Sequence, residues 1–226
     1  MTDPTLDRAG DVLHPHNRLV SGVMREADDP MMQRILTAAV DAFAERGFNG
    51  TNIRDIGARG GMSSGSLYNH FSSKADILST IMLRGIMNLV SLSEQALGQA
   101  GENAVDRLDA LVAVHVGLHA AHPRESIVGN AELHNLEPDA RSAVVFYRDR
   151  QEDLFHATIL RGIDQGVFAT DVPREAARFI VVACTGVARW YRTSDESPVD
   201  ALIATYQKLA RSTVGHHWPP LRDATP

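Results

Sequence analysis

Apolar residues in this 226-residue chain recur three and four positions apart, which is the spacing of one face of an α-helix. No segment of four or more residues alternates cleanly between polar and apolar side chains, as a half-buried β-strand would. Together these patterns predict an all-α fold of about nine helices. Beyond residue 100, where glycine and proline divide the pattern, helices are expected at 103–121, 125–134, 138–164, 173–193 and 199–214.

The first ordered helix is expected to begin at Asp28-Asp29-Pro30, where an aspartate caps the helix and proline takes the first helical position. Gly47 stands where a left-handed residue would end that helix. A second short helix is expected to start at Thr51, and Ser63 to cap a third.

A long fourth helix is expected to open at Ser73, with Asp76 completing a capping box. Three short helices within about 45 residues, joined by tight turns, are typical of a helix-turn-helix domain.

The third helix is too short to persist alone in water, so Leu67 and Phe71 must hold it against the first two helices. Serine and asparagine can bond base edges, and tyrosine and histidine can reach phosphate oxygens. We therefore expect this helix to lie against DNA. Its outward residues form a set without lysine or glutamate: Ser64, Gly65, Ser66, Tyr68, Asn69 and His70.

Two cations, Arg54 and Lys74, occupy the first turns of helices, where a positive charge opposes the helix dipole. A bound phosphate would remove that penalty, because the helix N-terminus and the cation would both face an anion. The chain has a net charge of −6, whereas residues 30–80 sum to +1 (five cations against four carboxylates). An anionic partner would therefore prefer this segment.

The chain resembles the TetR family of bacterial transcriptional regulators over about 45 residues. The resemblance rests on apolar, glycine and Leu-Tyr-x-x-Phe positions that fall in register. They are Ile35-x-x-Ala38-Ala39-x-x-x-Phe43-x-x-x-Gly47-Phe48, then Thr51-Asn52-Ile53-Arg54-Asp55-Ile56, then Gly61-Met62-Ser63-Ser64-Gly65-Ser66-Leu67-Tyr68-Asn69-His70-Phe71-Ser72-Ser73-Lys74. Two mild departures are Met62, where valine is common, and Asn52, where a second threonine is common.

The resemblance implies an N-terminal DNA-binding domain and a divergent C-terminal ligand-binding and dimerisation domain. It also implies that the last two helices pair with their copies in a homodimer, as a two-fold operator requires. Gly65 is added to the DNA contacts because close approach of its backbone to the major groove would offset its cost of about 1 kcal/mol in a helix. The DNA contacts implied by the family fall on Thr51, Arg54, Ser64, Ser66, Tyr68, Asn69, His70 and Lys74.

The effector pocket is expected among the helices beyond residue 100, where a few polar residues interrupt apolar surroundings. Each of them could equally be a structural polar residue. The stretches 130–133 and 188–192 are similar to the branch of the family that regulates fatty-acid or steroid catabolism. This similarity implies an acyl-CoA or other lipid-like effector, with an amphipathic drug-like molecule as the second choice. The candidates are His115, His119, Asn130, His134, Tyr147, Arg150 and Trp190.

Three other features of the sequence bear on alternatives to a DNA-binding regulator. Gly61-Met62-Ser63-Ser64-Gly65 matches the Gly-x-Ser-x-Gly motif of a hydrolase nucleophile elbow. That motif needs a strand before the serine, whereas a helix is expected here. His115 and His119 lie one turn apart and could share a metal ion, which leaves open a helical metal-binding or enzymatic protein. Cys184, the only cysteine, excludes an intramolecular disulfide and indicates a reducing compartment.

No stretch approaches about 18 consecutive apolar residues, and the N-terminus lacks the pattern of a secretory signal. We expect a cytoplasmic repressor that is not an enzyme, has no cofactor and binds no membrane. We expect it to be released from a palindromic DNA operator by its effector. The predicted organisation is a mobile tail at 1–27, a helix-turn-helix domain at 28–75, a ligand-binding and dimerisation domain at 76–214 and a second tail at 215–226.

Overall fold

A computed structural model describes residues 23–24, 28–192 and 198–216, and the remainder of the two expected tails lies outside the described residues. The described chain forms nine α-helices and one short 3-10 helix, without a strand, so the all-α prediction is confirmed. The helices are α1 (Pro30–Arg46), α2 (Ile53–Gly60), α3 (Ser64–Tyr68), α4 (Lys74–Gln99), α5 (Ala104–Ala121), α6 (Pro123–Ala131), η2 (Leu133–Asn135), α7 (Pro138–Asp164), α8 (Pro173–Trp190) and α9 (Val199–Thr213).

The N-terminal helices begin at caps that the sequence encodes. Asp29 accepts hydrogen bonds from the backbone N–H groups of Met31 and Met32, at 2.8 and 2.9 Å. Ser63 caps α3 through the Ser66 N–H at 3.1 Å, and Ser73 caps α4 through the Asp76 N–H at 3.0 Å. These short-range hydrogen bonds explain why the starts of α1, α3 and α4 are readable from sequence.

Two boundaries in this region differ from the sequence prediction. The second helix begins at Ile53 rather than Thr51, because Asn52 is its N-cap and forms a capping box with Asp55. The third helix covers only Ser64–Tyr68 and is shorter than two turns. The sequence pattern carried Phe71 into that helix, whereas the structure places Phe71 in the following turn, still buried against α1 and α4.

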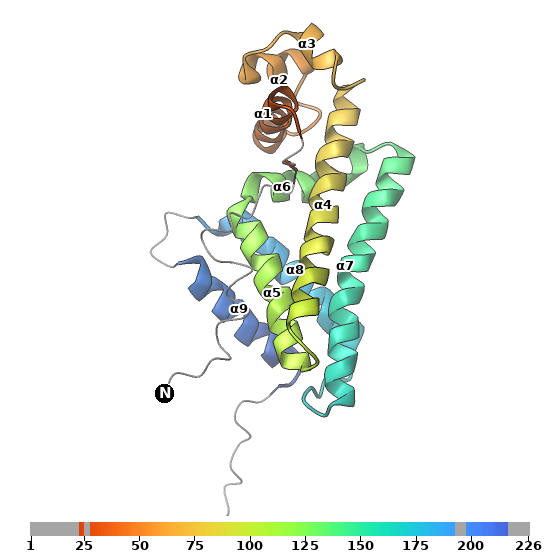
Figure 1. Ribbon diagram of the computed structural model, residues 1–226, viewed down its shortest axis with the longest axis vertical. Coiled ribbons are helices and arrows are strands. Elements are labelled where there is room, and N and C mark those ends of the chain that lie inside the picture. The colour runs from red at the N-terminus through yellow and green to blue at the C-terminus, as the bar shows by residue number, and fades with distance from the viewer. Residues whose placement is uncertain (1–22, 25–27, 193–197, 217–226) are drawn as a thin grey trace, which may run out of the picture.

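Helices α1, α2 and α3 form one end of the molecule, and α4 runs from them along the larger body made by α5, α6, α7, α8 and α9 (Figure 1). The central helix is α5, in which every residue from 110 to 120 is buried. It packs against α4, α7, α8 and α9. A helix that is apolar on all sides requires such neighbours on all sides.

The core of the N-terminal end is not confined to its own three helices. Val128 of α6 and Val144 of α7 belong to the same buried cluster as Ile35, Phe43 and Leu67. The segment from α6 to the start of α7 is thus packed directly against the helix-turn-helix.

By length and composition, α4 is the one helix of the described chain that could cross a membrane. This is weak evidence, since core helices of soluble proteins have the same properties. Its apolar residues pack in two places, with Ile77 and Ile81 in the N-terminal core and Leu89 and Ala96 beside α5.

Candidate DNA-binding surface and effector cavity

The surface of α3 lies at the far end of the molecule from α9 (Figure 1). Leu67 and Phe71 point inward and are buried, as the spacing predicts. Tyr68 is 55% exposed although it is a large aromatic residue. Gly65 and Asn69 are also exposed, and Ser64, Ser66 and His70 are half-buried. Asn69 and His70 follow the last residue of α3, and Nδ1 of His70 lies 3.7 Å from the Asp29 carboxylate.

A set of backbone contacts holds α3 at its angle to α2. Gly61 has a φ of 64° and ends α2 in the left-handed conformation, which a residue with a Cβ rarely adopts. The Arg34 guanidinium of α1 donates to the Gly60 and Gly61 carbonyls, at 2.6 and 3.2 Å. A Cβ on Gly57 would lie 2.9 Å from the Met62 carbonyl, so the two helices meet at a glycine.

The start of α2 presents Arg54 to solvent. This side chain is exposed and forms no ion pair with any described residue. The nearby carboxylate of Asp55 instead accepts from the Asn52 N–H at 2.9 Å in the capping box. An unpaired guanidinium at a helix N-terminus is a suitable phosphate ligand.

Two expected DNA contacts are engaged inside the protein. Thr51 is only 2% exposed, and its hydroxyl donates to the carbonyls of Ala42 and Gly47 at 3.2 and 2.8 Å. Its side chain is therefore part of the core, which corrects the prediction that it faces DNA. The physical reason is the turn after α1, which folds Thr51 back onto that helix.

The Lys74 ammonium donates to the carbonyls of Phe48 and Thr51, both at 2.7 Å, and lies 4.0 Å from the centre of the Phe48 ring. A cation in the first turn of α4 thus has carbonyl and aromatic partners within the chain. This network ties α4 to the turn between α1 and α2, so phosphate is not needed to explain Lys74.

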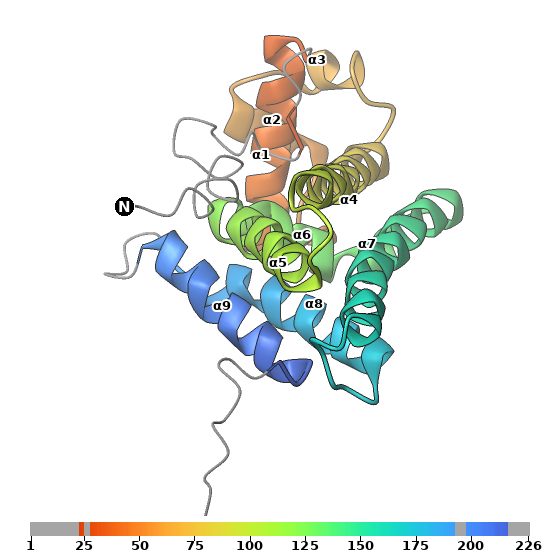
Figure 2. The same ribbon diagram turned by 60° about the horizontal axis from the view of Figure 1, so that its bottom comes forward.

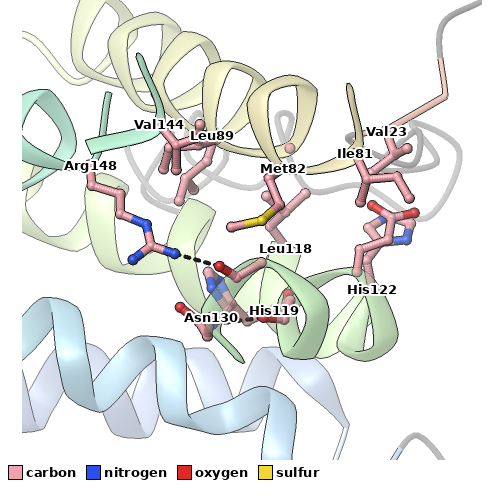
Figure 3. Close-up of a pocket in the computed structure, with 15 residues that line it drawn as sticks. Val23, Ile81, Met82, Leu89, Leu118, His119, His122, Asn130, Val144 and Arg148 are labelled. Atoms are coloured by element: carbon pink, nitrogen blue, oxygen red, sulfur yellow. Dashed lines mark hydrogen bonds between the residues drawn. The ribbon is translucent and has the colours of Figure 1, made fainter. Parts of the chain in front are cut away.

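The C-terminal body contains two adjoining cavities, of about 530 and about 80 Å³. The larger one lies between α4, α5, α6, α7 and α8, and the smaller one lies beside it against α4 and α6 (Figure 3). The larger volume is within the range of sites for small molecules. Both cavities share the residues Ile86, Leu89, His119, Ser126, Asn130 and Arg148.

His115 and His119 are buried side by side in the wall of the larger cavity, with their rings stacked 4.6 Å apart. The Nδ1–H of His119 donates to the His115 carbonyl at 2.8 Å, and His115 Nε2 bonds the Thr185 hydroxyl at 2.9 Å. Burial lowers the pKa of His119 to about 4, and burial together with His119 holds the pKa of His115 well below its usual value. Both rings are therefore neutral at physiological pH.

Arg148 reaches from α7 toward α6 and donates to the Gly129 carbonyl (Figure 3). It lines both cavities, and it has no carboxylate partner among the described residues. Burial lowers the pKa of its guanidinium, but a guanidinium stays charged at neutral pH. A partly buried cation without an anion is stabilised by any ligand that brings a negative charge.

The structure brings together three of the seven expected pocket residues, His115, His119 and Asn130. His134 lies in η2 and is exposed, and Tyr147 packs edge-on against Phe146. Arg150 pairs on the surface with Glu94 at 2.8 Å, and Trp190 is exposed at the end of α8. These four residues line neither cavity: the rotation of α7 and α8 about their axes turns Tyr147, Arg150 and Trp190 outward, and His134 lies in η2, beyond the end of α6.

The sequence reasoning missed several polar residues of the larger cavity. They share a helix face with apolar cavity residues, and only the three- and four-residue spacing from those neighbours could have indicated them. These are Ser126, Arg148, Asp149, Gln151, Glu152, Arg178, Thr185 and Arg189.

Helix α6 connects the cavities to the helix-turn-helix. Arg124, in its first turn, pairs with Asp41 and Glu45 of α1 at 2.6 and 3.2 Å. Glu132, just beyond its last turn, accepts a hydrogen bond from the Phe48 N–H. Because α6 also lines both cavities, a ligand and the DNA-binding end contact the same short helix.

The geometry of the described residues does not support a metal site, a hydrolase nucleophile or a reactive thiol. The described residues contain no group of three or more histidine, cysteine, aspartate or glutamate side chains that could hold a metal ion. Ser63 is the N-cap of α3 and follows a helix, which does not fit a nucleophile elbow. Burial raises the pKa of the Cys184 thiol to about 12, so this thiol is unreactive.

Two protein-family models match this chain, one over the N-terminal end and one over the C-terminal body. Residues 35–81 match the family described as bacterial regulatory proteins, tetR family. Residues 101–214, half of the chain, match the family described as the tetracyclin repressor-like C-terminal domain. The protein is a DNA-binding transcriptional regulator, not an enzyme, and it belongs to the TetR family.

Its relatives and structural neighbours are bacterial transcriptional regulators. The transcriptional repressor KstR2 of Mycobacterium tuberculosis is 29% identical over 178 residues, which are 78% of this chain and 88% of KstR2. A TetR-family regulatory protein from Rhodococcus RHA1 has a similar structure, with a TM-score of 0.77, 28% identity, and coverage of 84% of this chain and 100% of that one. FadR from Bacillus subtilis, solved in complex with stearoyl-CoA, shares the fold with a TM-score of 0.64, 21% identity, and coverage of 80% and 98%.

Proposed function

We propose that this protein is a homodimeric repressor that binds a palindromic operator and leaves it when an acyl-CoA occupies the cavity. The observation that carries the effector assignment is Arg148, a cation without a carboxylate partner in the described chain, in the wall of a cavity of about 530 Å³ that has both polar and apolar residues in its lining. In this proposal the working division is a DNA-binding part at 28–75 and an effector-binding and dimerisation part at 76–214, in a protein of the cytoplasm.

On the DNA side, α3 of each subunit enters the major groove with Tyr68 and Asn69 toward the duplex. Two such helices reach successive grooves when they lie about 34 Å apart. Arg54 binds phosphate, which makes operator affinity depend steeply on salt. The exposed face of α3 and the unpaired Arg54 support this arrangement.

On the effector side, the acyl group lies along Ile86, Leu89 and Val181 inside the larger cavity. Arg148 binds the nearest anionic or thioester oxygen. Arg189, an exposed residue of α8 that also lines the cavity, is available to phosphates of the coenzyme, whereas Arg178 pairs with Glu152 at 3.1 Å. FadR, solved with stearoyl-CoA, shares this fold and supports an acyl-CoA as the ligand class.

The two functions are coupled through α6. An acyl-CoA that moves α6 disturbs the Arg124 pairs and the Glu132 hydrogen bond to α1 and its following turn. The separation of the two α3 helices then no longer matches the operator. By linkage, the effector binds the DNA-free protein more tightly than the DNA-bound protein.

The dimer forms through α8 and α9, which lie together on one side of the larger body (Figure 2). Phe179 and Val182 of α8 are 63% and 64% exposed, and Leu209 of α9 is 55% exposed. Large apolar side chains that are open to water mark an interaction surface, although Val182 also lines the larger cavity.

The test begins with in-vitro selection from random duplex DNA, followed by fluorescence anisotropy of the selected operator. Stearoyl-CoA and octanoyl-CoA should release the operator, whereas coenzyme A alone should not. Arg148→Met should weaken release by about ten-fold, since a charge-assisted hydrogen bond is lost, without changing operator affinity. Arg150→Met, on the same helix but paired with Glu94 on the surface, is the matched control and should behave as wild type.

Sequence-blind binding to DNA, persisting after the protein is stripped of ligand by unfolding and refolding, would refute the repressor assignment. Specific operator binding that no acyl-CoA relieves would refute only the effector assignment.

A further inference from the structure

The wall of the larger cavity holds polar atoms that no protein group satisfies. His119 provides one acceptor in this wall. A carbonyl can only accept, so the His119 nitrogen that bonds the His115 carbonyl, Nδ1, must carry the ring hydrogen. With its pKa lowered to about 4, the ring is neutral, so Nε2 has a lone pair and accepts. The described residues provide no partner for this Nε2.

Gln151 repeats this pattern on α7. It is only 2% exposed and lines the same cavity. Its Nε2 donates to the Ser93 hydroxyl at 2.9 Å, and its Oε1 has no hydrogen-bond partner within the described structure. A buried amide oxygen left unpaired is unfavourable, and a ligand donor would recover that loss.

His115 adds a third group to the same wall. The ring is 1% exposed, its Nε2 bonds Thr185, and its Nδ1 has no partner among the described residues. His115 also contacts Phe155 edge-on, with ring centres 5.9 Å apart. Phe155 lies one turn beyond Gln151 on α7, so His115 and Gln151 belong to one region of the cavity.

Arg148 lies one turn before Gln151 and sets the direction in which a ligand would lie. Along one face of α7, the Arg148 guanidinium is followed by the Gln151 amide and then by the Phe155 ring. An anionic group at Arg148 therefore places the body of the ligand beside His119 and Gln151. Two of the unpaired atoms there, His119 Nε2 and Gln151 Oε1, are acceptors, and both require a hydrogen-bond donor.

We propose that the effector carries a hydroxyl group on its apolar body, and that His119 and Gln151 recognise this hydroxyl. The inference rests on the proposed function and specifies its ligand as a hydroxylated acyl compound rather than a plain hydrocarbon chain. The hydroxyl donates to His119 Nε2 or, after rotation of the Gln151 side chain, to its Oε1. A ketone at the same position accepts only and cannot replace it.

The test compares dodecanoyl-CoA with its 3-hydroxy, 12-hydroxy and 3-oxo analogues, by calorimetry on the full-length protein without DNA. At least one hydroxylated compound should bind about ten-fold more tightly than dodecanoyl-CoA, and the 3-oxo compound should show no gain. His119→Phe keeps a stacked ring but removes the acceptor, so it should abolish the difference in affinity between the hydroxylated compound and dodecanoyl-CoA. Gln151→Met is the second variant, in case His119→Phe does not fold.

His156→Phe is the matched control, since His156 lies on α7 near Arg174 and lines neither cavity. Equal affinities for all four compounds would overturn the inference. Water would then donate hydrogen bonds to His119 and Gln151 as well as a ligand hydroxyl does. A hydroxyl preference that survives in both His119→Phe and Gln151→Met would also overturn it. Operator release is measured separately, so tight binding of a hydroxylated compound without release would refute the proposed function and leave this inference standing.

Discussion

The carboxylate of Glu132 accepts a hydrogen bond from the backbone N–H of Phe48 at 3.1 Å, across 84 residues of sequence. Glu132 is buried, and its second oxygen accepts from the Asn135 amide at 2.6 Å. Asn49, next to Phe48, in turn bonds Asn135 at 3.3 Å. The end of α6 and the turn after α1 are thus joined by a small polar network inside a packed contact. Such a network has few alternative arrangements, which suits an element that transmits a displacement.

Replacing Glu132 by alanine should weaken communication between the cavity and the operator. The Phe48 N–H would lose its partner, so we expect a loss of about 1–3 kcal/mol in the free energy of unfolding. The concentration of stearoyl-CoA needed to release the operator should change at least about five-fold. Chemical denaturation and operator anisotropy measure the two effects. Glu137→Ala, at an exposed residue before α7 without a capping hydrogen bond, is the control. An unchanged release curve in the Glu132 variant would exclude this network from the coupling.

Tyr68→Ala should weaken operator binding by about ten-fold or more, because an exposed aromatic contact is removed from both copies of α3. Circular dichroism should show unchanged helicity, since Tyr68 is 55% exposed and supports no core. Tyr147→Ala, on α7 far from α3, provides the comparison. Wild-type affinity in the Tyr68 variant would contradict the placement of α3 in the groove.

Arg54→Ala should reduce affinity by a similar factor for the operator and for unrelated DNA. A dimer that loses two phosphate contacts should lose about two units of slope in log K against log salt concentration. Anisotropy titrations at several salt concentrations measure this slope. Arg161, which pairs with Glu102 at the opposite end of the molecule, is the control position. A loss confined to the operator sequence would instead indicate a base contact.

Phe179→Asp should convert the dimer to monomers, because a charge would be buried in an apolar interface. Sedimentation velocity should show the change in mass, and operator binding should fall with it. Phe146→Asp is the matched control, since Phe146 is 65% exposed but lies on α7. If the Phe179 variant remains dimeric and the Phe146 variant does not, the interface is on α7.

Asp109 should make stability depend on pH. Burial raises the pKa of its carboxyl from 3.8 to about 6, against the opposing effect of Arg211, with Asp106 and His216 contributing nearby charge. Between about pH 4 and pH 6 the folded protein holds this proton and the unfolded chain does not. The contribution of Asp109 to stability therefore falls as pH rises through this window and stays low above it.

Asp109→Asn should consequently stabilise the protein more at pH 8 than at pH 5, by about 1–2 kcal/mol. Denaturation at both pH values and one protein concentration measures the difference. Asp164→Asn, at an exposed position near the end of α7, should show no such difference. Equal effects at the two pH values would mean that Asp109 ionises as it does in the unfolded chain.

The helices and the DNA-binding end can be predicted from the sequence, because their signals are local. A capping residue bonds a backbone group two or three positions away, as Asp29, Ser63 and Ser73 do. The faces of α3 follow from the spacing of Leu67 and Phe71. For the same reason the helices beyond residue 100 lie within a few residues of their predicted bounds.

Which polar side chains meet depends on how the helices pack, and no local pattern predicts it. Thr51 and Lys74 suit phosphate contacts in sequence, but the fold of the turn after α1 gives both of them internal partners. Arg148 and Arg150 are two residues apart and equally polar, yet one enters the cavity and the other meets Glu94 outside. The difference is the rotation of α7 about its axis. That rotation is set by packing against α4, α5 and α8, which are distant in sequence, so no local pattern contains it.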